Sequence, residues 1–165
     1  MARDYERAIQ HSFRALEMEP EFSAAHLTRG LAYEQTSRYD EAIGAFEKAR
    51  AKSGGNPATL AALGHVLASA GRQDEAVVLL NQLRDLSRQR YVSAIWPALV
   101  HAGLGEHELA IDDLEIAYGE RDFWLLWLGR EPRFDCLRSQ QKFQDLLERI
   151  GLQRRSVNGG AAPLA

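Results

Sequence analysis

Apolar side chains recur at the spacing of an α-helix from the beginning of the chain. Over residues 4–18 they form one helical stripe, made of Tyr5, Ala8, Ile9, Phe13, Ala15 and Leu16. This stripe predicts a first helix from about Asp4 to Met18. Pro20 should end that helix, because the residue before a proline avoids the α region.

The same spacing then continues in pairs of segments separated by short turns. We expect three helical hairpins, over residues 22–52, 57–86 and 91–118, with turns near residues 36–38, 71–72 and 105–106. A short aromatic helix near residues 123–128 and a last helix over about residues 139–150 should follow, and residues 153–165 should form a disordered tail. Pro97 falls inside the third hairpin, where it should kink the first helix or shift its start.

Small residues recur in these hairpins at a fixed spacing of 34. Gly30 returns as Gly64, and Ala42 returns as Ala76 and Ala110. A period of this length is typical of a solenoid of helical hairpins. A glycine in mid-helix costs about 1 kcal/mol relative to alanine, which is tolerable if the second helix of the hairpin packs against the bare backbone. We therefore interpret these residues as packing positions, and the pattern favours a binding scaffold over an enzyme.

Residues 37–49, SRYDEAIGAFEKA, together with Arg29, Gly30 and Tyr33, resemble a tetratricopeptide repeat (TPR). The resemblance covers about residues 3–124: a half repeat over 4–20, repeats over 23–56 and 57–90, and a degenerate repeat over 91–124. It implies one all-α domain over residues 3–152, a right-handed superhelical solenoid of antiparallel helix hairpins. Residues 125–152 would form its C-terminal cap.

Residues 131–152, EPRFDCLRSQQKFQDLLERIGL, resemble the end of TPR arrays that follow winged-helix regulator, adenylate-cyclase or serine/threonine-kinase domains in bacteria. This second resemblance implies the C-terminal part, or a stand-alone relative, of such a regulator. The array also begins in the middle of a repeat, so the first helix lacks the partner that the pattern expects. Missing upstream sequence or another chain would then cover its apolar face.

In TPR proteins the first helices of successive hairpins line a concave groove that accepts a peptide or a helix. Carried over by repeat position, the resemblance implies a partner-binding groove made of Leu27, Leu31, Glu34, Ala61, His65, Ala68, Val92, Ile95 and Leu99. Most of these are apolar or small, which suits an amphipathic segment. The basic and amide positions that bind a C-terminal carboxylate in chaperone-binding TPRs are absent here. The alternative is that these residues pack between adjacent repeats, or against a missing N-terminal part.

An aromatic cluster follows the last repeat: Phe123, Trp124, Trp127 and Leu128. Tryptophans in such a cluster can anchor a partner. They can also cover the open face of the terminal hairpin, which a solenoid must close. We favour the second interpretation, a hydrophobic lid.

Composition narrows the remaining function classes. The net charge of −3 over 165 residues gives no case for nucleic acid or an anionic membrane as partner. The single cysteine, Cys136, and the lack of an apolar leader favour a cytoplasmic protein. The histidines show no pair at helical spacing, so we expect no metal site, and no motif predicts a cofactor.

These observations predict a non-catalytic scaffold that binds a partner protein or peptide in its concave groove, in a bacterial regulatory or assembly system. Two alternatives stay open. The chain could be the sensor part of a larger signalling or transcription protein, with its groove occupied intramolecularly. It could also be a homodimerisation module, joined through the unpaired first helix.

Overall fold

The computed structural model describes residues 4–152, and every regular element in that range is a helix. The elements are α1 (Tyr5–Met18), α2 (Ser23–Gln35), α3 (Tyr39–Lys52), α4 (Pro57–Ser69), α5 (Gln73–Ser87), α6 (Ile95–Leu104), α7 (His107–Gly119), the 3₁₀ helices η1 (Phe123–Arg130) and η2 (Pro132–Leu137), and α8 (Gln141–Ile150). The predicted disordered tail lies outside the described residues.

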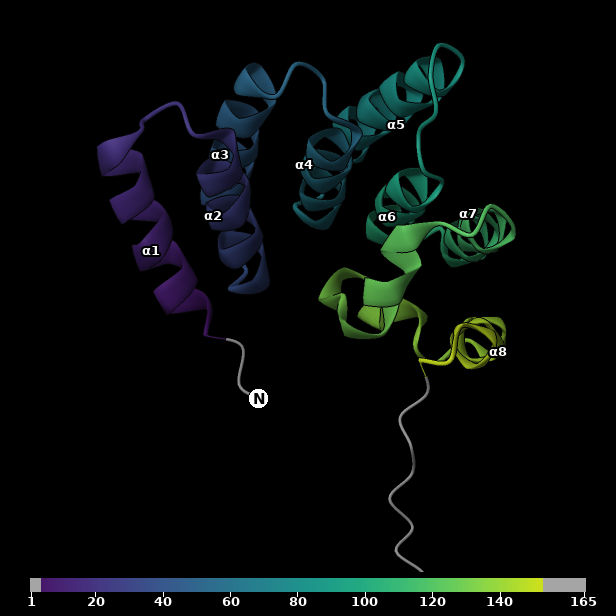
Figure 1. The fold of residues 1–165 in the computed structure, drawn as a ribbon. Coiled ribbons are helices and arrows are strands. Elements are labelled where there is room, and N and C mark those ends of the chain that lie inside the picture. Colours follow the sequence, from purple (N-terminus) through teal and green to yellow (C-terminus); the bar gives the residue numbers. More distant parts are fainter. Residues whose placement is uncertain (1–3, 153–165) are drawn as a thin grey trace, which may run out of the picture.

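The helices form successive hairpins that stack along an arc (Figure 1). Within each hairpin, α2 packs on α3, α4 on α5 and α6 on α7, while α4 and α6 join one hairpin to the next. The hydrophobic core runs without interruption through this stack, from Ile9 in α1 to Leu147 in α8. The prediction of an all-α solenoid of antiparallel helix hairpins is confirmed.

The turn inside each hairpin repeats with the period of the sequence. Ser37, Gly71 and Gly105 each adopt a left-handed backbone, with φ of 58°, 81° and 77°. The next amide then donates back across the turn: Arg38 to the Tyr33 carbonyl at 2.9 Å, and Arg72 to the Leu67 carbonyl at 2.8 Å. This closure satisfies carbonyls that the end of a helix leaves unpaired. Glycine enters this conformation without steric cost, which explains why two of the three positions hold it.

The small residues are packing positions, as their spacing predicts. Ala42, Ala76 and Ala110 are all fully buried. A Cβ built on Gly30 would lie 2.5 Å from the Phe46 ring, which comes from the second helix of the same hairpin. Gly64 differs from the expectation, because its nearest neighbour is Val100 of the next hairpin, 2.9 Å from the built Cβ. That glycine therefore serves the contact between hairpins more than the contact within one.

Pro97 shifts the start of a helix rather than kinking it. The chain stays irregular after Tyr91, and α6 begins only at Ile95, which makes Pro97 its third residue. The amide of a third helical residue has no partner within the helix, so proline loses nothing there. The Ser93 hydroxyl accepts a hydrogen bond from the Ile95 amide at 3.3 Å and so helps to start the helix.

The C-terminal segment continues the stack in shortened form. Helix η2 packs on α6, and α8 packs on α7. Lys142 of α8 donates to Glu108 of α7 at 2.6 Å, and Arg149 bonds Glu115 in the same way. Both pairs are separated by 34 residues in the sequence, so α8 follows α7 with the spacing of the repeats. The segment after α7 turns back below α6 (Figure 1). This turn brings η1 and η2 to the candidate site, which is described next.

Candidate partner-binding site

The structure separates the residues of the expected groove into two groups. Glu34, Ala61, His65 and Ala68 are buried, and the Glu34–His65 pair joins α2 to α4 of the next hairpin. Leu27, Leu31, Ile95 and Leu99 instead line one pocket. The ninth residue, Val92, is partly buried and lines a second pocket. Packing between repeats therefore describes the Glu34–His65 pair. The second group and Val92 each line a hollow, although Ile95 and Leu99 are themselves buried.

The pocket that these four residues share has a volume of about 400 Å³. Its lining comes from α2, α4, α6 and the C-terminal segment, and consists of Leu27, Leu31, Ala58, Ala62, Ile95, Trp96, Leu99, Trp124, Trp127, Leu128, Glu131, Arg133 and Phe134. Small-molecule and side-chain pockets typically have such volumes and such apolar linings. The pocket can therefore hold a bulky apolar group.

Two tryptophans of η1 form the outer wall of this pocket, and the geometry of the 3₁₀ helix explains their position. Residues three apart eclipse one another in a 3₁₀ helix. Leu125 and Leu128 therefore share one face and are buried, while Trp124 and Trp127 share the next face and are 45% and 53% exposed. The Asp122 side chain caps the helix by accepting the Trp124 amide at 2.8 Å. The tryptophans are thereby held at the rim of the pocket.

Only part of the aromatic segment covers the core, whereas the expected lid would use all of it. Leu125 and Leu128 cover the core, and Trp124 and Trp127 line the pocket. Trp96 of α6 meets Trp124 edge to face, with ring centroids 5.2 Å apart. In the sequence, Leu125 and Leu128 are three residues apart, and so are Trp124 and Trp127. This spacing could have distinguished the buried leucines from the pocket-lining tryptophans, if the segment had been recognised as a 3₁₀ helix.

An ion pair forms the polar edge of the pocket. Arg133 of η2 donates from Nε to Glu131 Oε1 at 2.8 Å and from Nη2 to Oε2 at 3.0 Å, and its side chain is 9% exposed. Burial alone would raise the pKa of Glu131, but the hydrogen bonds and the charge of Arg133 outweigh it, so this pKa lies below its usual value. Both groups are therefore charged and bound to each other.

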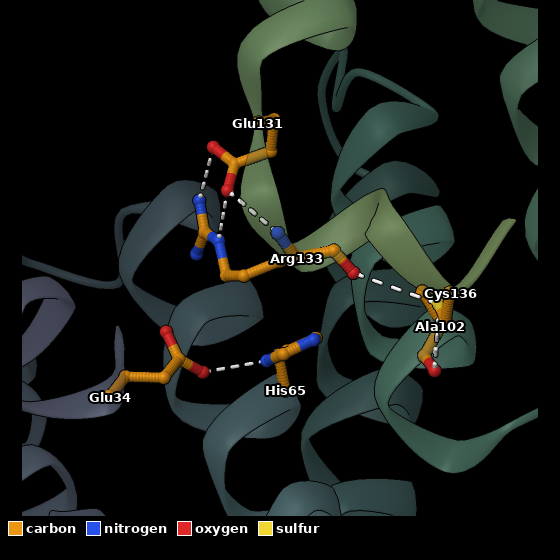
Figure 2. Close-up of polar contacts among 6 residues, drawn as sticks. All are labelled: Glu34, His65, Ala102, Glu131, Arg133 and Cys136. Carbon is orange, nitrogen blue, oxygen red and sulfur yellow. Dashed lines mark hydrogen bonds and ion pairs between the residues drawn. The ribbon is translucent and has the colours of Figure 1, made fainter. Parts of the chain in front are cut away.

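A second buried pair lies beside the first. The Glu34 Oε1 atom is 2.6 Å from His65 Nδ1, and the two side chains are 3% and 11% exposed. The other oxygen of Glu34 has no hydrogen-bond partner among the described residues. Figure 2 shows the Arg133 guanidinium between the carboxylates of Glu131 and Glu34, and the charge of Glu34 contributes to raising the pKa of Arg133. The sequence placed Glu34 and His65 in the groove without indicating that they bind each other.

Residues 131–133 also reach the first two helices. They line a further pocket of about 290 Å³ with Tyr5 and Ala8 of α1 and Leu31 and Gln35 of α2. Behind them, the thiol of Cys136 lies 3.9 Å from the Ala102 carbonyl (Figure 2). The C-terminal segment therefore occupies part of the face that the repeats turn inward.

Buried acidic and histidine side chains also occur elsewhere. The ring of His101 lies 2.6 Å from Glu106 through Nδ1 and 3.7 Å from Asp113 through Nε2. His26 and His101 are buried, and Asp113 is partly buried beside His101. Over residues 4–152 no group of three or more His, Cys, Asp or Glu side chains could hold a metal ion. No helix in the same range is long and apolar enough to cross a membrane.

Comparison with known proteins agrees with this architecture. A tetratricopeptide repeat family model matches residues 33–95, and a second one matches residues 2–57. Neither match extends into the last third of the chain, so the likeness of that part to bacterial regulators stays a prediction. No curated protein and no solved structure gives a significant match. Tetratricopeptide repeats are generally modules of protein–protein interaction and typically non-catalytic. The chain belongs to the tetratricopeptide repeat family.

Proposed function

We propose that this protein is a non-catalytic scaffold that binds a peptide or helix of a partner protein, and that an apolar side chain of the partner enters the pocket between α2, α4, α6 and η1. The observation that carries the proposal is the pairing of an apolar hollow with two exposed tryptophans at its rim. Tryptophan is enriched among the residues that dominate binding energy at protein interfaces.

The size of the pocket suits a large side chain of the partner. Full burial of a leucine, methionine or phenylalanine side chain contributes about 1.5–3 kcal/mol. Contact with an aromatic ring adds about 0.5–1.5 kcal/mol when the partner residue is itself aromatic. One anchor of this kind, with backbone and rim contacts around it, is typical of a helix or peptide bound in a groove.

The polar groups around the pocket support recognition rather than catalysis. General acid–base work needs a group that is free to exchange a proton with a substrate. Glu131 and Arg133, the charged residues of the lining, hold each other in an ion pair. Glu34 and His65 are buried behind them and bound to one another. These paired side chains are therefore better suited to holding the shape of the pocket than to exchanging protons with a substrate.

Selection of peptides from a displayed random library tests the proposal. The wild-type chain should enrich peptides that share an apolar residue, and these peptides should lose affinity for Trp127→Ala. The matched control is Leu126→Ala, because Leu126 is also exposed on η1 but lies outside the pocket lining. Failure to enrich any peptide, or an equal loss in both variants, would contradict the proposal.

The alternative of an intramolecularly occupied groove also has an observation in its favour. Residues 131–133 lie against α1 and α2 and take up part of the inward face. If this segment is displaced by a partner, a selected peptide should speed amide hydrogen exchange in η2. If the partner enters the existing pocket, exchange in η1 and η2 should slow. Hydrogen exchange measured with and without the peptide therefore separates the two modes.

A regulatory or assembly role in a bacterial cytoplasm remains part of the proposal, supported by the sequence resemblance of residues 131–152.

Homodimerisation through the first helix is the remaining alternative. Helix α1 packs on α2, while Phe13 and Met18 are exposed on it. Light scattering at two concentrations tests this version, which predicts a dimer that Met18→Glu dissociates. A monomer at both concentrations would exclude it.

A further inference from the structure

A second pocket shares a wall with the first one. Its volume is about 390 Å³, and it is lined by Pro57, Tyr91, Val92, Ser93, Trp96, Glu120, Arg121, Asp122, Phe123 and Trp124. Trp96 and Trp124 line both pockets. A chain that places one side chain in the first pocket can therefore reach the second with a neighbouring side chain.

Two carboxylates give the second pocket its charge. The Tyr91 hydroxyl lies 3.2 Å from Glu120 Oε2 and 3.1 Å from Asp122 Oδ2. A hydroxyl has a single proton to donate, so it satisfies one of these oxygens at a time. Partial desolvation, together with the hydrogen bonds and charges of the two neighbouring carboxylates, raises the pKa of Tyr91 to about 12, and the phenol therefore stays neutral. The two carboxylates, both in the lining of the pocket, therefore keep acceptor capacity beyond the single proton that they share.

Aromatic rings line the same pocket as these carboxylates. Phe123 and Trp124 meet edge to face, with centroids 6.0 Å apart, and Trp96 meets Trp124 in the same manner at 5.2 Å. The faces of such rings attract cations, and tryptophan attracts them most strongly. Aromatic rings combined with carboxylates are complementary to an organic cation rather than to an anion or a neutral apolar group. The first pocket, by contrast, has an almost wholly apolar lining.

We propose that the second pocket binds the cationic side chain, arginine or lysine, of the same partner segment whose apolar residue enters the first pocket. The partner is then a basic amphipathic peptide or helix. The inference rests on the proposed function and adds the chemistry of the partner to it.

Arg121 is the one charge in the lining that opposes a cation. Its guanidinium offsets one of the two carboxylates and leaves a net charge of −1 in the lining. Replacement by neutral glutamine should therefore strengthen the binding of basic peptides. The same replacement should leave a peptide with only the apolar anchor unaffected, because Arg121 lies outside the lining of the first pocket.

The test compares peptide selection on three forms of the full chain. The first is the wild type, and the second is the double variant Glu120→Gln, Asp122→Asn. The asparagine can still cap η1, since its side-chain oxygen can accept the Trp124 amide. The third is Glu47→Gln, Asp74→Asn, a matched control that removes the same charge from exposed positions outside both pockets.

The inference predicts that peptides selected on wild type and control carry an arginine or lysine at a fixed distance from the apolar residue. On the double variant the basic residue should lose its enrichment while the apolar residue keeps it. A selected basic peptide should bind the double variant about tenfold more weakly, and Arg121→Gln more tightly than wild type.

Three other results would overturn the inference in distinguishable ways. Apolar enrichment without a basic residue on the wild type would refute the second subsite and leave the proposed function intact. No enrichment on any form would refute the proposed function and the subsite together. Equal affinity of a selected basic peptide for the double variant and the control would also refute the subsite, because the carboxylates would then contribute nothing.

Discussion

Arg133 and Glu131 form a two-pronged ion pair at the edge of the apolar pocket, with nitrogen–oxygen distances of 2.8 and 3.0 Å. Replacement of Arg133 by methionine would leave two carboxylates, those of Glu131 and Glu34, without the cation that lies between them. Removal of one partner from a buried pair typically costs about 3–5 kcal/mol. Chemical denaturation should show a loss of this order for Arg133→Met. Arg88→Met, which breaks an exposed pair with Asp85, should change the free energy of unfolding little. Equal losses in the two variants would mean that the buried Glu131–Arg133 pair contributes no more to stability than an exposed pair does.

Gly30 and Gly44 should respond to alanine in opposite directions. A Cβ on Gly30 would approach the Phe46 ring to 2.5 Å, whereas a Cβ on Gly44 meets nothing within 4 Å. Overpacking should therefore destabilise Gly30→Ala by about 1–3 kcal/mol. Gly44→Ala should stabilise the protein by about 0.5–1 kcal/mol, because alanine loses less conformational entropy in a helix. Thermal unfolding measures both changes, and the same sign for both would refute the packing explanation.

The contribution of Asp113 to the stability of the protein should fall as pH rises through the titration of this carboxyl. Burial raises the pKa of this carboxyl from 3.8 to about 6, although His101 opposes the shift. The folded state therefore holds the proton more tightly than the unfolded state, and stability is lost between these two values. The Asp113→Asn variant cannot ionise at this position. The difference between its melting temperature and that of the wild type should therefore increase in favour of the variant from about pH 4 to about pH 6, and stay constant at higher pH. A constant difference over this range would contradict the assignment.

The regular part of the fold was predictable because its physical causes are local. Pro20 and Pro57 mark the end of one helix and the start of another. The recurring glycine after the first helix of a hairpin marks a left-handed turn. Pro97 predicted either a kink or a shifted start, and the structure has the shifted start of α6. Each of these effects depends on one residue and its near neighbours, so the sequence alone expresses it.

The candidate site was predictable only in part, because it depends on a segment outside the regular repeats. Leu27, Leu31, Ile95 and Leu99 were expected in the groove and line the pocket. Helix η2 was missed, although a proline such as Pro132 commonly occupies the first position of a helix. The Glu131 side chain caps this helix by accepting the Arg133 amide at 3.3 Å. Without η2, nothing indicated that Arg133 would lie near Glu34, or that the tryptophans would face α2.

The central claim is that a partner side chain enters the pocket walled by η1, and the indole N–H signals of the tryptophans test it most directly. The chain has three tryptophans, Trp96, Trp124 and Trp127, whose signals in a proton–nitrogen NMR spectrum can be assigned by single substitution to phenylalanine. Titration with a library-selected peptide should shift the signals of Trp124 and Trp127 in step with binding measured by calorimetry. A peptide that binds while all three indole signals stay in place would contradict the account.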